Sequence, residues 1–267
     1  MKMITQKAYA KINLTLDVLA KRDDGYHEIE SVMQTLTFCD EVKLMQNDSG
    51  ELTTGSNLYY LPNDERNNAI VAAKVFYKEL SVTPQGVHIQ IRKCIPTNSG
   101  LGGGSADAAA VLRGLNIMHG NQLSIDELVT LAEQIGSDVP FCIRGGTQLA
   151  RGRGETLTPL TPMPFCWVVL CKTGRKDSTG NMFARLEEIR DIECTTPYNN
   201  KFTALLPIAK LAIEKLIKHG ATTASLTGSG PTVFGLFHDM NKAYAAARAM
   251  QRGYKEIYVT TIKEKIR

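Results

Sequence analysis

The feature that most restricts the fold of this chain is a run of glycines between two regular segments. Residues 95–116 read IPTNSGLGGGSADAAAVLRGLN, in which four of the five positions from 100 to 104 are glycine. Glycine clusters occur in linkers, in sharp turns and where the backbone must approach a ligand too closely for a Cβ atom. An alternating strand-like segment precedes the run and an alanine-rich helix-like segment follows it. A linker needs neither, so the run predicts a built turn.

This run matches neither of the two common nucleotide-binding patterns. No Gly-Lys-Ser/Thr follows the glycines as in a Walker A loop, and Ser105 and Asp107 stand where a GxGxxG motif would place its last glycine. The run still offers bare backbone N–H groups that lead into a helix N-terminus, where the helix dipole favours an anion. From these residues alone, an anion site and a plain glycine turn with a small-residue packing face both remain open.

Hydrophobic periodicity predicts that strands and helices are mixed along the chain, which indicates an α+β fold with two halves divided near residue 160. Alternation from Lys11 to Asp17 places Lys11 and Asn13 on one polar face of a strand. In the first half we expect a strand over 11–18, a hairpin with its turn at 23–25 that continues to Phe38, a helix over 66–80, a strand over 87–91, a helix from about Ser105, a helix from a Ser124/Glu127 capping box to Gly136, and a loop with a short strand and turns over 137–160. In the second half we expect a buried strand over 166–171 and a polar connection over 172–202 with one helix near Phe183 to Ile189. A helix over 203–218, a turning strand over 226–237, a helix over 241–251 and a strand over 257–262 are expected to follow.

Charge and cysteine content argue against several classes of protein. The 31 Lys and Arg residues against 27 Asp and Glu give a net charge of only +4 without a run of like charges, so we expect no nucleic-acid partner. Lysines interrupt every apolar stretch of MKMITQKAYAKINLTL, so we expect no membrane segment and a cytoplasmic location. No CxxC or HExxH spacing indicates structural zinc, and the cysteines are expected to be reduced thiols: Cys39, Cys94, Cys142, Cys166, Cys171 and Cys194. The oligomeric state cannot be read from the sequence.

Three segments together resemble the GHMP small-molecule kinases. PTNSGLGGGSADAA resembles their phosphate-binding segment, and LTGSGPTVFGLF (226–237) resembles their third glycine motif. KAYAKINLTLDVLAKRDDGYHEIESVMQTL resembles their first motif as one branch carries it, with Gly-Tyr-His after the first strand, and GSDVPF and GRGE (152–155) also resemble that branch. The resemblance implies a two-lobed fold with the active site in the cleft between lobes. Residues 1–160 would form an ATP-binding lobe with the catalytic base, and residues 161–267 a substrate-side lobe.

The resemblance also implies a reaction. The branch transfers the γ-phosphoryl group of ATP, expected with Mg²⁺, to a hydroxyl of a small molecule that carries a cytidine diphosphate, in isoprenoid precursor synthesis. By resemblance, Asp138 is the general base that accepts the hydroxyl proton, and Lys11 lies beside it, keeps it ionised and steadies the transferring phosphoryl group. From the residues alone, Asp138 is more simply a turn residue and Lys11 a solvated strand lysine.

The remaining roles follow from the same resemblance. The ATP-binding residues would be Pro96, Gly100, Leu101, Gly102, Gly103, Gly104, Ser105, Ala106 and Asn67, of which Ser105 is also a candidate ligand for the magnesium of ATP. The substrate-binding residues would be Asn13, Tyr26, His27, Asp138, Thr179, Phe183, Gly228 and Ser229. Asn67 could equally be a helix cap, Tyr26 and His27 ordinary packing residues, and Gly228 to Gly230 a plain turn.

Two segments depart from the branch pattern, both on the substrate side. Residues 172–183 read KTGRKDSTGNMF where the branch usually carries Pro-x-x-Gly-Val-Ser-Thr, and Thr203 to Leu206 stand where it usually has Asn-Asp-Leu/Phe-Glu. A kinase of the same family with another alcohol acceptor, and a non-catalytic nucleotide- or metabolite-binding protein of the same fold, are therefore alternatives. Joint retention of Lys11, Asp138 and the glycine run favours an enzyme, since a binding module needs no base.

Overall fold

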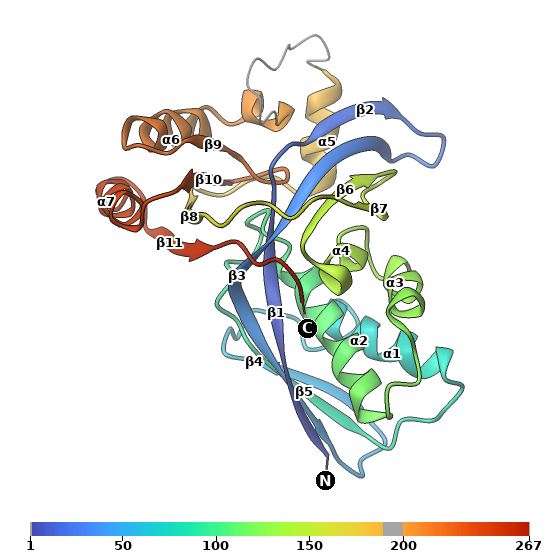
Figure 1. Cartoon of the computed structure of the whole chain (residues 1–267). Coiled ribbons are helices and arrows are strands. Elements are labelled where there is room, and N and C mark those ends of the chain that lie inside the picture. Colours follow the sequence, from blue (N-terminus) through green and yellow to red (C-terminus); the bar gives the residue numbers. More distant parts are fainter. Residues whose placement is uncertain (1, 189–199, 267) are drawn as a thin grey trace.

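The structure, a computed structural model, describes residues 2–188 and 200–266. Within these residues the strands form one seven-stranded and one four-stranded sheet, and helices cover a face of each (Figure 1). The first sheet uses residues between 3 and 159 and the second uses residues between 167 and 261. The chain is therefore α+β, as the sequence predicts.

The long strand β3 organises the first sheet. Its 20 residues, His27–Gln46, pair with four other strands along their length, and the order across the sheet is β4-β5-β3-β6-β7 with β1 and β2 also paired to β3. The β1–β3 ladder is antiparallel and shifts register between Tyr9 and Lys11, directly before the lysine that faces the pocket described below. The other strands are β1 (Met3–Asn13), β2 (Asp17–Lys21), β4 (Leu52–Ser56), β5 (Val87–Arg92), β6 (Thr147–Arg151) and β7 (Thr156–Pro159).

Small side chains let helix α2 (Gly103–Met118) lie close to the first sheet. Its alanines are fully buried, and a Cβ atom at Gly114 would come 2.3 Å from Leu44 Cδ1 on β3. α2 thus forms the centre of a dense apolar core between the sheet and its neighbouring helices. These neighbours are α1 (Asn68–Glu79), α3 (Ile125–Glu133) and α4 (Val139–Arg144).

The second sheet is antiparallel and carries its own core. Its order is β11-β8-β10-β9, and all six residues of β10 (Thr232–Phe237) are buried. The other strands are β8 (Trp167–Lys172), β9 (Thr223–Leu226) and β11 (Glu256–Thr261), and the helices are α5 (Thr179–Glu187), α6 (Pro207–Lys218), α7 (Met240–Met250) and a short 3₁₀ turn, η1 (Lys201–Leu205).

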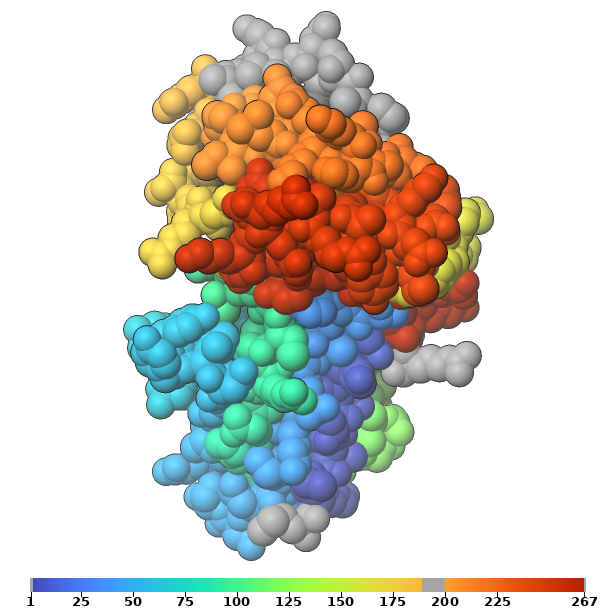
Figure 2. All heavy atoms as spheres, turned by 90° about the vertical axis from the view of Figure 1, so that its left-hand side faces the viewer, coloured from blue at the N-terminus to red at the C-terminus, as the bar shows by residue number. Residues whose placement is uncertain are grey.

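A third apolar cluster joins the two halves. Ile12 of β1 and Leu36 of β3 pack in one buried cluster with Val168 of β8 and Phe234 of β10. After β11 the chain returns to the first sheet, where Lys263 N donates to Thr35 O at 2.9 Å. Figure 2 shows the two halves in contact along a waist across the molecule.

Most of the expected elements are present, with differences that have local causes. The strand expected over 11–18 is interrupted after Asn13, because the Thr15 hydroxyl accepts a hydrogen bond from Val32 N (2.9 Å) and replaces a ladder bond. Helix α2 begins at Gly103 rather than Ser105, because Gly102 ends the loop with a left-handed backbone (φ 71°). The Ser124/Glu127 capping box is confirmed, although its helix ends at Glu133 rather than Gly136.

Three further differences concern short or proline-bounded segments. Residues 139–144, expected within a loop and strand region, form helix α4, which is too short to show a helical period. The helix expected over 203–218 is divided, because Pro207 begins α6 and the preceding residues form η1. The helix expected near Phe183 to Ile189 is α5, which starts at Thr179, and the side chain of Ser178 caps its N-terminus. Ile189 itself lies outside the described residues.

Two further expectations concern the state of the cysteines and the presence of membrane-spanning helices. The cysteines that the structure describes, Cys39, Cys94, Cys142, Cys166 and Cys171, are free thiols, and Cys194 lies outside the described residues. In residues 2–188 and 200–266, none of the helices has the length and apolar character that crossing a bilayer requires.

Candidate active site

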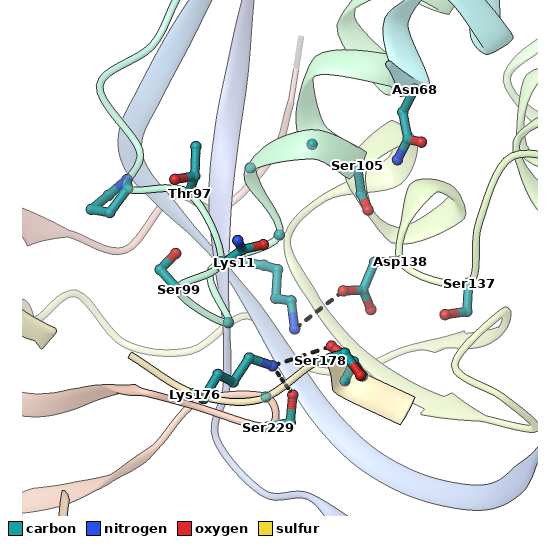
Figure 3. A pocket seen from close by; sticks show the side chains of 18 of the residues that line it. Lys11, Asn68, Thr97, Ser99, Ser105, Ser137, Asp138, Lys176, Ser178 and Ser229 are labelled. Atoms are coloured by element: carbon teal, nitrogen blue, oxygen red, sulfur yellow. Dashed lines mark hydrogen bonds and ion pairs between the residues drawn. The ribbon is translucent and has the colours of Figure 1, made fainter. Parts of the chain in front are cut away.

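A cavity of about 840 Å³ lies where the two halves of the chain meet. Lys11 on β1, the glycine run and Asp138 line it from the first half, and the segment from Lys176 to Phe183 and the Gly228–Ser229 turn line it from the second half. Figure 3 shows that polar side chains from these segments point into one shared space. The pocket therefore requires both halves to be folded and in contact.

The glycine run forms one wall of the pocket, and two of its positions require glycine. Gly100 and Gly102 have positive φ angles of 83° and 71°. A Cβ atom at Gly100 would come 2.4 Å from Thr227 O, and one at Gly102 would come 2.9 Å from Lys11 Cγ. No side chain caps the N-terminus of α2, and Gly103 and Gly104 line the pocket there. The first amides of a long helix thus face the pocket, which suits a phosphate group.

Lys11 and Asp138 meet across the pocket although they are far apart in the sequence. Lys11 Nζ lies 3.4 Å from Asp138 Oδ2, and the lysine side chain is 4% exposed whereas the aspartate side chain is 35% exposed. Asn13 Oδ1 accepts a hydrogen bond from Lys11 Nζ at 2.6 Å. The carboxylate can therefore be reached by a ligand while the ammonium is fixed behind it. Such a pair can accept a proton from an alcohol and stabilise negative charge beside it.

Asn13 and the Gly228–Ser229 turn form the joint between the halves at the floor of the pocket. Asn13 Oδ1 accepts from Gly228 N (2.9 Å), and Asn13 N donates to Thr227 Oγ1 (3.0 Å). Asn200 Nδ2 donates to Gly228 O at 2.7 Å and fixes the other side of the turn. Asn13, expected to bind substrate, lines the pocket but uses its amide for these contacts. Thr227 and Asn200 were not predicted from the sequence.

The aromatic residues expected near the substrate divide into two groups. The His27 ring stacks on Phe183 with centroids 5.1 Å apart and an interplanar angle of 22°, and His27 Nε2 lies 2.7 Å from Glu187 Oε1. Thr179 and Phe183 line the pocket. Tyr26 does not belong to the lining, since its ring lies on the surface under Arg153, 5.0 Å from the guanidinium carbon. Neither His27 nor Tyr26 lines the pocket itself, but each contacts a residue that does: His27 contacts Phe183, and Tyr26 contacts Arg153.

The residues expected to bind ATP also differ in whether they line the pocket or are buried in the apolar cores. Pro96, Ser105 and Asn67 line the pocket, and Asn67 is at the same time the cap of α1, where its side chain accepts from Ala69 N at 3.0 Å. Leu101 and Ala106 are buried in the apolar cores. The backbone of Leu101 still has a role, because its carbonyl accepts from Lys11 N at 3.0 Å.

A buried charge cluster lies against the glycine run, and two of its members, Lys93 and Asp107, also line the pocket. Lys93 Nζ bonds to Asp107 Oδ2 at 2.6 Å and also pairs with Asp40. Asp40 Oδ1 accepts from Ile95 N at 2.7 Å, which fixes the strand that leads into the run. Burial raises the pKa of Asp107 to about 7, and the nearby Asp40 carboxylate adds to this effect while Lys93 opposes it. This cluster was not predicted from the sequence, since its three members come from separate segments.

Lys176 is the pocket residue that sequence reasoning most clearly missed. Its Nζ donates to Ser229 Oγ and to Thr179 Oγ1 (3.1 Å), so it links the two segments of the second half that line the pocket (Figure 3). Burial lowers its pKa to about 8, and the charge of Lys11 adds to this effect while Asp138 opposes it. The residue lies in the segment 172–183 that departs from the branch pattern, which was the only available signal.

Comparisons with known proteins agree with this architecture. The family model described as the GHMP kinases N terminal domain matches residues 67–146, and the one described as GHMP kinases C terminal matches residues 175–256. A 4-diphosphocytidyl-2-C-methyl-D-erythritol kinase of Brevibacillus brevis is 40% identical, over 96% of this chain and 95% of the relative. The enzyme of the same name from Caldicellulosiruptor saccharolyticus is 41% identical, over 97% of this chain and 96% of the relative.

A solved structure gives the same result at the level of the fold. The crystal structure of a 4-(cytidine 5'-diphospho)-2C-methyl-D-erythritol kinase matches with a TM-score of 0.83 at 28% identity. The match covers 97% of this chain and 99% of that one. The similarity therefore extends through both halves and across the pocket between them.

Proposed function

This chain belongs to the GHMP kinase family, and on that premise we propose that it phosphorylates the 2-hydroxyl of 4-diphosphocytidyl-2-C-methyl-D-erythritol with ATP, in non-mevalonate isoprenoid precursor biosynthesis. The observation that carries the proposal is the Lys11–Asp138 pair, 3.4 Å apart, facing the bare amides of a glycine run. The family resemblance inferred from the sequence is confirmed by the comparisons. Reduced cysteines support a cytoplasmic location.

The residues of the pocket support a direct transfer. The amides of Gly102, Gly103 and Gly104 would hold the ATP phosphates at the N-terminus of α2, where the helix dipole favours negative charge. Asp138 would accept the proton of the acceptor hydroxyl as the oxygen attacks the γ-phosphorus and ADP leaves. Lys11, which Asp138 and Asn13 hold in place, would offset the charge on the transferring group.

The pocket also offers suitable oxygen atoms for the magnesium ion expected with ATP. Ser105 lines the pocket at the first turn of α2, and Asp107 Oδ1 is a buried oxygen without a hydrogen-bond partner on the same wall. Hydroxyl and carboxylate oxygens are ligands that Mg²⁺ prefers, usually in combination with phosphate oxygens. When bound, the ion would neutralise charge on the ATP phosphates. Within the residues that the structure describes, no group of three or more His, Cys, Asp or Glu side chains is arranged to hold a metal.

The second half of the pocket supports a cytidine-bearing acceptor. The His27–Phe183 stack offers an aromatic edge beside the pocket, and Thr179 lies one turn earlier on α5. An aromatic surface with nearby hydrogen-bonding groups suits a nucleobase. We assign the base of the acceptor to this side, and its alcohol end to Asp138.

A panel of acceptors tests the proposal directly. ADP release is measured with 4-diphosphocytidyl-2-C-methyl-D-erythritol, methylerythritol, mevalonate, galactose and homoserine as acceptors. The expected result is turnover with the cytidyl compound alone, because only that acceptor can occupy both the aromatic side and the catalytic side of the pocket. Turnover with another acceptor would show a related kinase of different specificity. ATP binding without turnover on any acceptor would instead support a non-catalytic protein.

A further inference from the structure

Lys176 is a pocket cation that is held by hydroxyl groups rather than by an ion pair among the described residues. Within the described residues, no carboxylate forms an ion pair with its Nζ, whereas Lys93, Lys172 and Lys201 each pair with a carboxylate. The adjacent Asp177 is paired with Arg185, 3.0 Å away. The partners of Lys176 are two hydroxyls, which position an ammonium but do not neutralise it.

The position of this ammonium indicates which anion it serves. Lys176 bonds to Ser229, and the neighbouring Thr227 hydroxyl donates to Gly100 O in the glycine run at 3.3 Å. The amines of Lys176 and Lys11 project into the same part of the pocket in front of Asp138 (Figure 3). The His27–Phe183 stack lies further along α5. The anion within reach is therefore the one that sits between the glycine run and Asp138.

We propose that Lys176 contacts the phosphoryl group in transit from ATP to the acceptor, as a second ammonium opposite Lys11; this inference rests on the kinase function proposed above. In phosphoryl transfer, negative charge spreads over the equatorial oxygens of the moving group, and fixed cations around it lower the barrier. Lys11 reaches the group from β1 and Lys176 from the second half of the chain. Contact between the halves would then complete the catalytic centre.

The lowered pKa of Lys176 is consistent with this role. Burial and the nearby Lys11 oppose its charge in the absence of a ligand, and bring the pKa to about 8. An arriving phosphate removes this penalty, because it supplies the missing negative charge. A lysine that served only to hold Ser229 and Thr179 together would not need to carry that electrostatic cost.

Steady-state kinetics of three variants test the inference. In Lys176→Met the turnover number is expected to fall about 100-fold, as when one fixed donor to a developing charge is removed, with the KM for the cytidyl acceptor nearly unchanged. Lys176→Arg, which keeps the charge, should recover most of the rate. Lys172→Met is the matched control, because Lys172 lies outside the pocket and pairs with Glu256 at 3.1 Å. Unchanged turnover in Lys176→Met, or a raised acceptor KM with unchanged turnover, would overturn the inference.

A binding measurement separates this inference from the proposed acceptor. Calorimetry compares the affinity of each variant for ADP and for AMP-PNP, a non-hydrolysable ATP analogue, without any acceptor. Lys176→Met is expected to weaken AMP-PNP binding about tenfold, through loss of a charge-assisted contact to the terminal phosphate, and to leave ADP binding nearly unchanged. Equal effects on both nucleotides would refute the contact. A wild-type protein that fails to phosphorylate the cytidyl compound would refute only the proposed acceptor.

Discussion

Backbone features around Lys11 and around Asp138 bring these two side chains together. A register shift precedes Lys11 on β1, and Asp138 is the N-cap residue of α4 and makes no side-chain cap bond of its own. Its carboxylate is therefore available to a ligand. Lys11, in contrast, is enclosed by protein and has fixed partners on two sides, Asp138 and Asn13.

The pH dependence of catalysis should report the charge of Lys176. Its pKa of about 8 means that it loses its proton as the pH rises past that value, so kcat/KM for ATP is expected to fall above pH 8. The charged groups that act on it are Lys11 and Asp138, and Arg153 lines the same pocket. In Lys176→Arg this decline should disappear, because guanidinium stays protonated throughout the range. The measurement is kcat/KM between about pH 6.5 and 9.5, and an identical decline in both proteins would contradict it.

At the level of single residues, local pattern predicted some contacts and could not predict others. The sequence placed Lys11 and Asn13 on one strand face, and family resemblance supplied Asp138 as their neighbour. Neither source could orient Lys176, because the segment 172–178 has no periodicity, nor predict that Tyr26 contacts Arg153 while its neighbour His27 stacks on Phe183. Those outcomes depend on how α5 packs against the β2–β3 hairpin, which is a tertiary contact.

The glycine run behaves as an element of its own, fixed on both sides. Leu101 O accepts from Lys11 N on β1, and Gly100 O accepts from Thr227 on the turn between β9 and β10. The run is thus a rigid connection between β1, α2 and the second half of the chain. Its glycines are required by backbone angle at Gly100 and Gly102 and by close approach of neighbouring atoms.

Gly100→Ala should therefore damage ATP binding more than its size suggests. The new methyl group would meet Thr227 O, and the left-handed backbone alone costs about 1–2 kcal/mol for an alanine. We expect a loss of stability of at least that size in urea unfolding and about a tenfold loss of ATP affinity. Gly253→Ala is the matched control, because no atom lies within 4 Å of its added Cβ. Wild-type ATP affinity in Gly100→Ala would show that the run has another purpose.

At the level of elements, long periodic segments were predictable and short ones were not. The helix expected over 66–80 is α1, and the strand expected over 87–91 is β5. Helix α4 was missed because six residues cannot establish a helical period, although Pro140 in its first turn is typical of a helix start. The break between β1 and β2 depends on the Thr15 hydroxyl, which a periodicity count does not include.

A few polar contacts at the pocket, together with the apolar cluster that both sheets share, hold the two halves of the molecule together. Thr227 is the centre of these contacts, since its hydroxyl accepts from Asn13 N and donates to Gly100 O. The two-lobed arrangement was predictable from family resemblance. The contacts that fix the lobes were not, because Asn13, Gly100 and Thr227 come from distant parts of the chain.

Thr227→Val should loosen this joint without changing the side-chain volume greatly. Asn13 N would be left buried without its partner, which costs about 1–3 kcal/mol of stability. We expect kcat/KM to fall about tenfold, because the groups on the two halves lose alignment. Thr222→Val is the control, since its hydroxyl donates to Leu236 O at the far end of β10. Urea unfolding and steady-state kinetics are measured for both variants. Equal stability and equal kcat/KM in the two variants would contradict the role of Thr227 in joining the halves.

The central claim is that Asp138 removes the acceptor proton while the glycine run holds ATP, and one variant tests it most directly. Asp138→Asn keeps the size of the side chain, which makes no helix-cap hydrogen bond, but removes its ability to accept a proton. Transfer of the labelled γ-phosphoryl group from ATP to the cytidyl acceptor is measured in a single turnover, with ATP affinity measured in parallel. Asp138→Asn is predicted to slow transfer on the order of 1,000-fold with ATP affinity nearly unchanged. Transfer at the wild-type rate would contradict the account.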